Sequence, residues 1–171
     1  IVADEAAFNE SFFGGLPYEE LNEIKVQVDL RGTETWGTCD RFLVAGDKAV
    51  MADYKTGISK IDTPKENWQA KAYTLGAFQQ FPNVKEIDFV FYIPVRNEVL
   101  HDKFTRDEVL FLTKELSDII NKGHEVRPKW VGGVPDHDDL SPTVNCRFCK
   151  HEDHCPALGG LALEVASRVA G

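Results

Sequence analysis

The sequence lacks the long apolar segments that membrane and secreted proteins carry. No apolar run approaches the roughly 20 residues needed to cross a bilayer, and the start of the chain shows no signal-peptide pattern. Cysteine is scarce as well, with only four residues, so we do not expect a framework of disulfides. These absences favour a cytoplasmic protein with no membrane partner.

Positive charge is also in short supply. The chain has 19 lysines and arginines against 28 aspartates and glutamates, which gives a net charge of −9. A protein without a strongly basic face binds nucleic acid weakly unless a partner protein helps it. The deficit is uneven, because residues 1–30 carry −6 of the −9, and acidic residues can also hold cations. The net charge therefore does not exclude a nucleic-acid partner.

Apolar residues make up 43% of the 171 residues, which is enough for a globular domain with its own core. Apolar periodicity and turn residues predict a mixed α/β domain in which helices flank a sheet. The predicted strands span residues 24–30, 37–44, 49–55 and 87–95, and the predicted helices span residues 63–81 and 105–122.

We expect a single domain over the whole chain. Its expected parts are a helical and loop segment at residues 1–22, a core at 24–122, a connecting arm at 123–144, and a cysteine-containing tail with a short helix at 145–171. Capping boxes at Thr63–Glu66 and Thr105–Glu108 predict where the two core helices begin. Gly123 is the predicted end of the second, because glycine commonly terminates helices.

Two carboxylates and a lysine are predicted to converge at one end of the sheet. Asp53 and Lys55 share a face, because side chains alternate along a strand, and hairpin pairing would bring Asp40 close to Asp53. Carboxylate oxygens suit Mg²⁺ or Mn²⁺, and a lysine beside such an ion can orient water or neutralise charge on a phosphate. The alternative is a solvated ion pair, which is what an isolated D-x-K usually represents.

A predicted helix supplies two further polar groups. Gln69 and Tyr73 lie four residues apart, and therefore on one helical face. Taken alone, Gln69 suggests a solvated residue and Tyr73 a core aromatic. Gly37, three residues before Asp40, permits a close approach to the backbone. These residues fall in three segments that follow in order: G-T-C-D-R-F, M-A-D-Y-K-T-G and N-W-Q-A-K-A-Y.

The order and spacing of these segments resemble the RecB-like branch of the PD-(D/E)XK nuclease superfamily, over roughly residues 24–95. The resemblance implies a restriction-endonuclease-like core with a mixed central sheet. It also implies a metal-dependent DNA nuclease, and more specifically an exonuclease, acting in phage or bacterial recombination or repair. A recombination or single-strand-binding protein is then an expected partner beside DNA.

The resemblance also implies a role for each site residue. Asp40 and Asp53 would hold Mg²⁺ or Mn²⁺, and Lys55 would be the catalytic lysine. Gln69 and Tyr73 would contact the DNA backbone or support the site.

One family feature is missing from the sequence. Members of this branch usually carry a His or Glu on a helix upstream of the first strand, as a further metal ligand. No histidine precedes His101. The candidate substitutes are Glu10, Glu19, Glu20 and Glu23, and their spacing does not choose among them.

Cys146, Cys149 and Cys155, followed by Pro156, form a compact cluster near the C-terminus. Thiolates at this spacing bind Zn²⁺ or an iron–sulfur cluster, and spacing alone does not choose between them. The C-x2-C-x5-C-P pattern resembles that of AddB helicase–nuclease subunits and CRISPR-associated RecB-like exonucleases. That resemblance implies a [4Fe–4S] cluster with a structural role.

The fourth ligand of this cluster is left open by the sequence. Cys39 is one candidate, although it sits beside Asp40 in the predicted hairpin and has an alternative as a small core residue. His151 and His154 would instead complete a zinc site. A ligand upstream of Ile1 is the third possibility.

Other interpretations apply to the remaining charges and to the function. Arg96, Lys103 and Arg106 follow the long predicted strand and would line a DNA groove, or they are ordinary solvated charges. The chain could also be a catalytically inactive DNA-binding or scaffold domain with the same fold. A zinc-ribbon-type interaction module, in which the D-Y-K segment is incidental, is the other alternative.

Overall fold

The computed structural model describes residues 2–132, 139–143, 146, 149–150 and 152–158. The chain forms two compact units, Ile1–Ser117 and Asp118–Gly171, which are described separately. The short helix predicted near the end of the chain lies outside the described residues.

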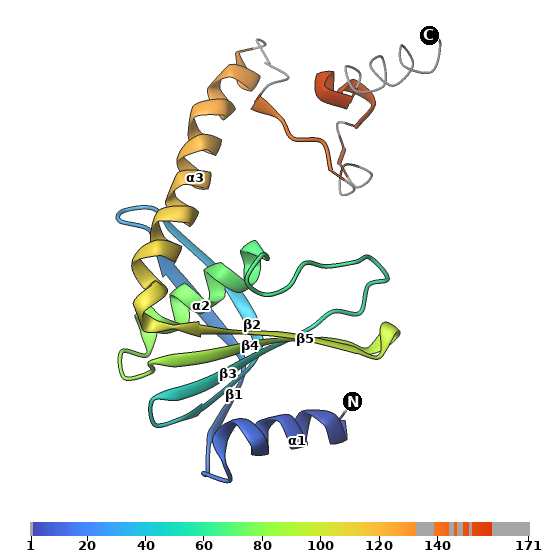
Figure 1. Ribbon diagram of the computed structural model, residues 1–171. Coiled ribbons are helices and arrows are strands. Elements are labelled where there is room, and N and C mark those ends of the chain that lie inside the picture. The colour runs from blue at the N-terminus through green and yellow to red at the C-terminus, as the bar shows by residue number, and fades with distance from the viewer. Residues whose placement is uncertain (1, 133–138, 144–145, 147–148, 151, 159–171) are drawn as a thin grey trace. The chain divides into compact units, whose positions relative to one another are not determined.

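A five-stranded mixed sheet forms the centre of the first unit, with strands in the order β1-β2-β3-β4-β5 (Figure 1). The strands are β1 (Glu19–Asp29), β2 (Glu34–Ala45), β3 (Lys48–Tyr54), β4 (Glu86–Ile93) and β5 (Glu98–Thr105). Neighbouring strands are antiparallel except β3 and β4, which are parallel. The predicted α/β class, a sheet flanked by helices, is confirmed.

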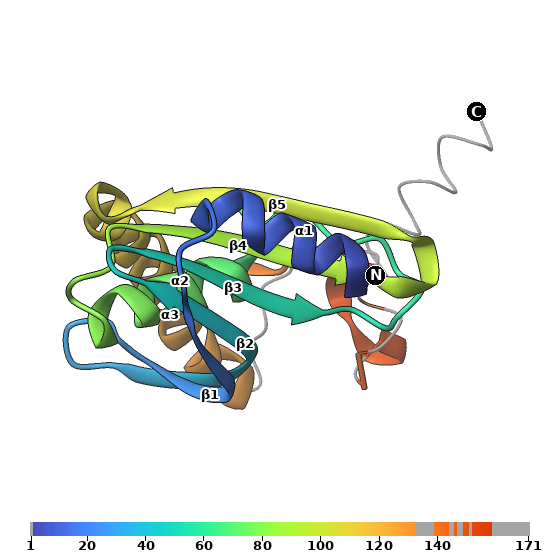
Figure 2. The ribbon, with the colours of Figure 1, turned by 90° about the horizontal axis from the view of Figure 1, so that it is seen from below.

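Helices cover both faces of this sheet. The covering helices are α1 (Val2–Phe13) and α2 (Trp68–Gln80), whereas α3 (Val109–Val131) follows β5 in the chain and includes the boundary between the two units. Figure 2 shows α1 across one face, with α2 on the other. Because β3 and β4 are parallel, the chain must cross over between them, and α2 belongs to that crossover. The carboxyl end of β3 therefore leads toward the start of α2.

The strand pattern of the sequence is largely reproduced. β2 and β3 form the predicted hairpin, closed by Gly46 and Asp47, and Gly46 takes the left-handed φ of 62° that such a short turn needs. The apolar run of β4 is buried from Ile87 to Ile93, as expected for a central strand, and Pro94 follows directly after it.

The start of α2 differs from the prediction. Thr63 does not cap the helix; its carbonyl instead accepts hydrogen bonds from the amides of Glu66 and Asn67 in a separate turn. Asn67 is the N-cap, and its side chain accepts from the amides of Gln69 and Ala70. The helix thus begins at Trp68, because an asparagine with two amide contacts competes well with the upstream box.

The second core helix also differs in length. The capping box at Thr105 and Glu108 is confirmed, but it heads a short 3-10 turn that leads into α3. Gly123 does not end α3, which continues with Pro128 inside it as far as Val131. An interior glycine costs a helix only about 1 kcal/mol relative to alanine, so neighbouring residues can override it. Part of the predicted connecting arm is therefore helical.

β5 was not predicted. Its exposed and half-buried residues alternate, and only Phe104 is fully buried, so it lacks the apolar signal of an interior strand. It pairs antiparallel with β4 at one edge of the sheet. Pairing with β4 thus makes a strand of a segment whose own composition favours no particular structure.

The core has one layer on each side of the sheet. On the α1 side, Phe13 packs against a buried cluster from three strands, comprising Leu43, Val50, Ala52, Val90 and Tyr92. On the α2 side, the helix approaches β1 so closely that a Cβ added at Gly76 would lie 2.4 Å from Val26 Cγ1 and 2.7 Å from the carbonyl oxygen of Gln27. Gly76 therefore sets how closely α2 approaches β1.

We predict opposite effects from alanine at two helical glycines. Gly76→Ala should lower the free energy of unfolding by roughly 1–3 kcal/mol, because backbone lies where the methyl group would go. Gly123→Ala, in α3 with nothing within 4 Å of an added Cβ, should raise it by up to about 1 kcal/mol. Urea unfolding followed by circular dichroism measures both, and equal effects would contradict the close packing of α2.

Candidate active site

Three predicted site residues meet at the carboxyl end of β3. The ammonium of Lys55 lies 2.7 Å from Asp53 Oδ2. Gln69 Nε2 donates to Asp53 Oδ1 at 2.9 Å, and Lys55 Nζ donates to Gln69 Oε1 at 2.6 Å. The three side chains therefore form a closed triangle in which each contacts the other two.

Local structure explains why this triangle forms. Asp53 and Lys55 are separated by one residue of extended chain, so their side chains share a face. Gln69 is the second residue of α2, and capping by Asn67 places it in the first turn of the helix. The crossover from β3 thus returns the chain with its first helical turn beside the strand end that it left.

Asp40 joins the site through the backbone. Its Oδ2 accepts a hydrogen bond of 2.8 Å from the amide of Tyr54, the residue after Asp53. The β2–β3 ladder ends at the pair Arg41–Ala52, so Asp40 lies just past the last pair. The predicted approach of the two hairpin strands is therefore present, with Asp40 contacting the main chain next to Asp53.

The electrostatics of Asp53 reflect a crowded acidic site. Burial raises the pKa of the Asp53 carboxyl, whose residue is 5% exposed, above its usual range. The contact with Lys55 opposes this rise in pKa, and the nearby negative charge of Asp40 adds to it. Two carboxylates beside one ammonium leave a surplus of negative charge, which a divalent cation would offset.

The donor set fits a hard divalent cation, with two carboxylates as the protein ligands. Mg²⁺ in particular keeps several waters and commonly takes only one or two carboxylates from a protein. Among the described residues, no group of three or more His, Cys, Asp and Glu side chains is placed to hold a metal ion. The four upstream glutamates considered as a further ligand are all exposed: Glu10, Glu19, Glu20 and Glu23.

Tyr73 contributes to the site indirectly. Its ring lies against Gly37 of β2, where an added Cβ would come within 2.3 Å of Tyr73 Cε1. Only glycine leaves room for the ring, which explains the glycine three residues before Asp40. This placement fits the supporting role for Tyr73, since the ring packs on the strand that carries Asp40.

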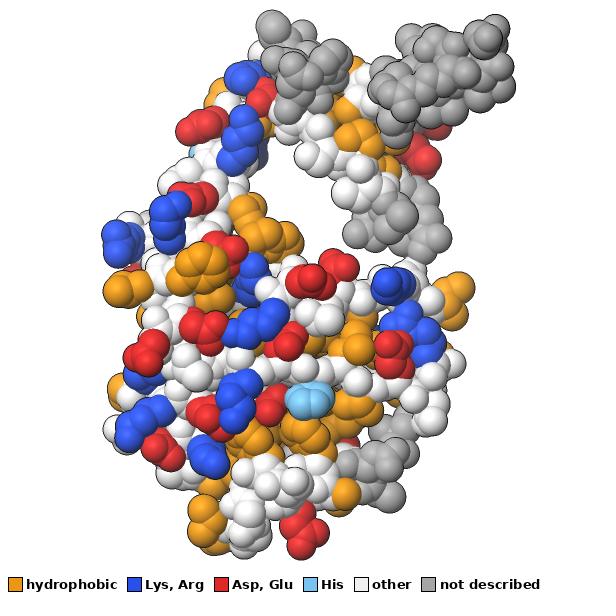
Figure 3. Space-filling view, viewed as in Figure 1, with side chains coloured by type: hydrophobic (Ala, Val, Ile, Leu, Met, Phe, Trp, Pro, Cys, Tyr) orange, Lys and Arg blue, Asp and Glu red, His pale blue; other side chains and the backbone are white. Residues whose placement is uncertain are grey.

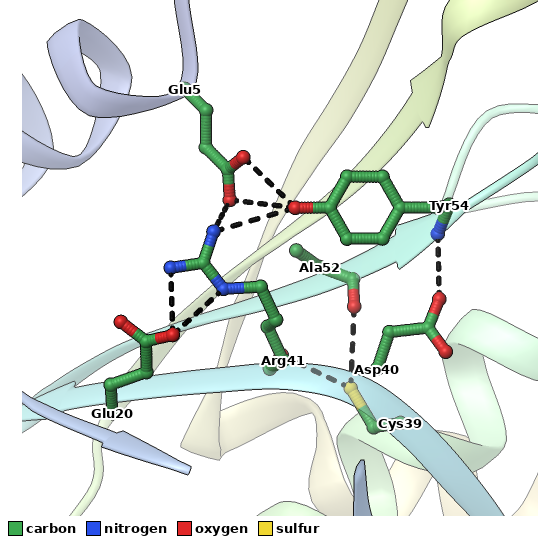
Figure 4. A network of polar contacts seen from close by, with 7 residues as sticks. All are labelled: Glu5, Glu20, Cys39, Asp40, Arg41, Ala52 and Tyr54. Atoms are coloured by element: carbon green, nitrogen blue, oxygen red, sulfur yellow. Dashed lines mark hydrogen bonds and ion pairs between the residues drawn. The ribbon is translucent and has the colours of Figure 1, made fainter. Parts of the chain in front are cut away.

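A polar network on the α1 side of the sheet was not anticipated from the sequence (Figure 4). Buried Glu5 of α1 pairs with Arg41, and its two carboxylate oxygens accept from the hydroxyl of Tyr54 at 3.0 and 2.9 Å. Glu20 of β1 holds the same guanidinium at 3.0 Å. The sequence signal was faint: Glu5 is one of seven acidic residues in the first thirty.

Cys39 has the properties of a core residue. Its thiol donates to the carbonyls of Arg41 and Ala52, at 3.2 and 3.6 Å, and burial raises its pKa to about 12. The charges of Asp53 and Asp40 also raise that pKa, so the thiol lies near both carboxylates. A thiol held in this protonated form is a poor metal ligand.

The second unit contains the three remaining cysteines, described as free thiols. The amide of Cys149 donates to the carbonyl of Cys146 at 2.8 Å, so the two lie at the ends of one turn. The amide of Thr143 donates to Cys146 Sγ at 3.2 Å. His151 and the side chain of His154 lie outside the described part of the chain, so their suggested part in a zinc site is not tested.

The three basic residues after β4 make contacts within the protein. Arg106 donates to the carbonyls of Phe78, Phe81 and Val84, and so closes the carboxyl end of α2. These three contacts hold Arg106 against the end of α2, and its expected place in a DNA groove stays a prediction. Lys103 pairs with Glu86 and Arg96 with Glu98. On the face drawn in Figure 3, basic and acidic side chains intermingle.

We predict that neighbouring charges move the pKa of Asp53 in opposite directions. Asp40→Asn should lower it, because a charge that raises the pKa is removed, and Lys55→Gln should raise it. Because the pKa of Asp53 is raised in the folded protein, protonation of this carboxyl stabilises the fold. This contribution to the free energy of unfolding is lost as pH rises through the pKa of the folded state. Titration of the ¹³C carboxyl shift in EDTA measures this. Asp88→Asn, on β4, is the control and should leave the pKa unchanged.

In the described part of the chain, no helix is long and apolar enough to cross a membrane.

Comparisons with known proteins place the chain in a family. A search of curated proteins finds no match. Among solved structures, the crystal structure of SSO0001 is similar, with a TM-score of 0.45 and 16% identity, and the alignment covers 91% of this chain and 66% of that one. The profile of the family described as protein of unknown function DUF2800 matches residues 20–169, and the chain belongs to that family.

Proposed function

We propose that the protein is a metal-dependent DNA nuclease, and specifically an exonuclease, that hydrolyses phosphodiester bonds. One observation carries the proposal: Asp53, Lys55 and Gln69, which come from two separate sequence segments, are in mutual contact. Asp40, from a third segment, binds the amide next to Asp53. An incidental D-x-K pair gives no reason for the other two segments to converge on it.

The proposed cation site uses the two carboxylates. Asp40 and Asp53 would hold Mg²⁺ or Mn²⁺, which supplies a Lewis acid for the phosphodiester and lowers the pKa of bound water. The acidic surplus around Asp53 supports this assignment. A bound cation would also reduce the repulsion between these carboxylates and the phosphates of DNA.

Lys55 and Gln69 have complementary parts in the proposal. The ammonium of Lys55 is held 2.7 Å from Asp53, where it can orient the attacking water and stabilise charge that grows on the phosphate. Gln69 accepts from Lys55 and donates to Asp53, so its amide fixes the position of both. Gln69 is therefore assigned to positioning and Lys55 to the chemistry.

The finer fold and the biological context are part of the same proposal. The β3–α2–β4 crossover, with its acidic residues at the end of β3, is consistent with a PD-(D/E)XK core of the RecB-like type. A role in phage or bacterial DNA recombination or repair, with a recombination or single-strand-binding partner, rests on the resemblance of the three segments. So does a [4Fe–4S] cluster at the three C-terminal cysteines, with Zn²⁺ as the alternative.

A nuclease assay with single-stranded and duplex DNA in Mg²⁺ or Mn²⁺ tests the proposed activity. Asp53→Asn removes a proposed metal ligand, and Lys55→Met removes the ammonium that would stabilise charge on the phosphate, so each should lower the cleavage rate by about 10²-fold or more. EDTA should abolish cleavage by the wild type. Product lengths over time separate cutting from an end from internal cutting.

The chain offers a matched control for Asp53. Asp88 of β4 is a carboxylate of similar burial, 6% against 5% exposed, with its pKa also raised by burial. It pairs with His101, which contacts Phe8 of α1 on the other face of the sheet. Asp88→Asn should cut like the wild type. Cleavage by Asp53→Asn at the wild-type rate would remove the site assignment, and a wild type without cleavage would favour an inactive DNA-binding domain.

The metal of the cysteine cluster is tested separately. Protein purified without oxygen should be brown, absorb visible light and contain iron, since thiolate-to-iron charge transfer colours such clusters. Cys149→Ala should lose the metal, whereas Cys39→Ala should retain it because that thiol is buried and protonated in the sheet. If the purified protein contains zinc and no iron, the [4Fe–4S] assignment is wrong and the zinc alternative holds. If Cys39→Ala loses the metal, Cys39 is a ligand after all.

A further inference from the structure

A buried carboxylate on α1 lies behind the candidate active site. The side chain of Glu5 is 8% exposed and pairs with the guanidinium of Arg41. Its two oxygens also accept from the hydroxyl of Tyr54. One residue of α1 thus joins two adjacent strands, β2 and β3, on the face opposite α2 (Figure 4).

The two strand residues that Glu5 holds each follow a proposed metal ligand. Arg41 comes directly after Asp40, and Tyr54 directly after Asp53. Any movement of the Arg41 or Tyr54 backbone therefore moves a neighbouring carboxylate. The separation of the two carboxylates depends on how firmly these two positions are held, because like charges repel when no cation lies between them.

Tyr54 links the two faces of the sheet directly. Its hydroxyl contacts Glu5, its ring stacks on Tyr92 at 5.5 Å, and its amide donates to Asp40 at 2.8 Å. On the α1 face of the sheet, the hydroxyl of Tyr54 is held by Glu5, and the backbone amide of the same residue binds the Asp40 carboxylate. A shift of the Tyr54 backbone would move the amide that Asp40 binds.

A second acidic residue contacts the same arginine and provides an internal comparison. Glu20 of β1 lies 3.0 Å from Arg41 Nη2, and its side chain is 37% exposed. An ion pair at that exposure contributes little, since solvent screens it. Glu5 is the more buried partner, and its contacts extend to both Arg41 and Tyr54.

We propose that Glu5 is a positioning residue that, through Arg41 and Tyr54, fixes the separation of the Asp40 and Asp53 carboxylates and so sets the affinity of the site for a divalent cation. The inference rests on the proposed function, because the cation site is the one assigned there. Residues that orient metal ligands without touching the metal commonly change metal affinity by 10- to 100-fold when they are lost. Glu5 would do so from the opposite face of the sheet.

The test measures Mn²⁺ binding to the purified protein by isothermal titration calorimetry, without DNA. Tyr54→Phe removes only the hydroxyl, and Glu5→Gln removes the charge with little change in shape. Each should raise the Kd for Mn²⁺ by about 10-fold. Glu20→Gln is the matched control and should bind nearly as tightly as the wild type. Asp53→Asn should abolish binding and so identifies the site.

Thermal unfolding separates positioning from stability. Melting in EDTA reports the fold alone, and the rise in Tm on adding Mn²⁺ reports the metal site. For Tyr54→Phe, a smaller metal-induced rise in Tm than in the wild type supports positioning, even where the Tm in EDTA also falls. A lower Tm in EDTA with an unchanged Kd, measured well below melting, is the result of a merely structural contact and overturns the inference.

The remaining outcomes are distinct. If the wild type binds Mn²⁺ and Asp53→Asn does not, while Tyr54→Phe and Glu5→Gln bind like the wild type, the positioning role is wrong and the proposed function stands. If Glu20→Gln weakens binding as much as Glu5→Gln, Arg41 alone is responsible and the role of Glu5 fails. If the wild type binds no Mn²⁺, both the proposed function and this inference are overturned.

Discussion

The contact between Lys55 and Asp53 is the interaction on which the candidate site depends. Asp53 is 5% exposed at the end of β3, where an unpaired carboxylate would be costly to ionise. The ammonium at 2.7 Å and the amide of Gln69 at 2.9 Å compensate for part of the lost hydration, and the pKa of the carboxyl stays raised. Because Asp40 adds a second carboxylate nearby, one ammonium does not balance the charge, and this imbalance is the physical basis of the proposed cation site.

The two faces of the sheet present different residues around these carboxylates. The α2 face presents Asp53 together with Lys55 and Gln69. The α1 face holds the residues next in sequence to Asp40 and Asp53 in a buried network around Glu5. Alternation along extended strands makes this division possible, since consecutive residues point to opposite sides. Glu5 therefore connects α1 to the residues that follow Asp40 and Asp53, beside the apolar packing of α1 on the same strands.

The direction of the strands determines where the site can lie. β3 and β4 are the parallel pair, so the chain leaves the end of β3 and returns through α2. The first turn of α2 then meets the residues at that end, with Asn67 fixing the start of the helix. Arg106 binds the carbonyls at the other end of α2, and Gly76 allows the helix to lie against β1. Contacts at its start, middle and end thus fix the position of α2, and from its first turn Gln69 contacts both Asp53 and Lys55.

The sequence by itself determined the α/β class, four of the five strands and the shared face of Asp53 and Lys55, because apolar periodicity and alternation are local properties. A place for Gln69 at the same site was implied only by the family resemblance, and its contacts with Asp53 and Lys55 depend on the crossover through α2. Only the tertiary structure decided the edge strand β5 and the extension of α3 beyond Gly123, whose local signals are weak or contrary. The tertiary structure also brought Glu5 into contact with Arg41, which lies 36 residues later in the sequence. Glu5 is one of several acidic residues near the start of the chain, and burial against Arg41 and Tyr54, which no local pattern encodes, distinguishes it from them.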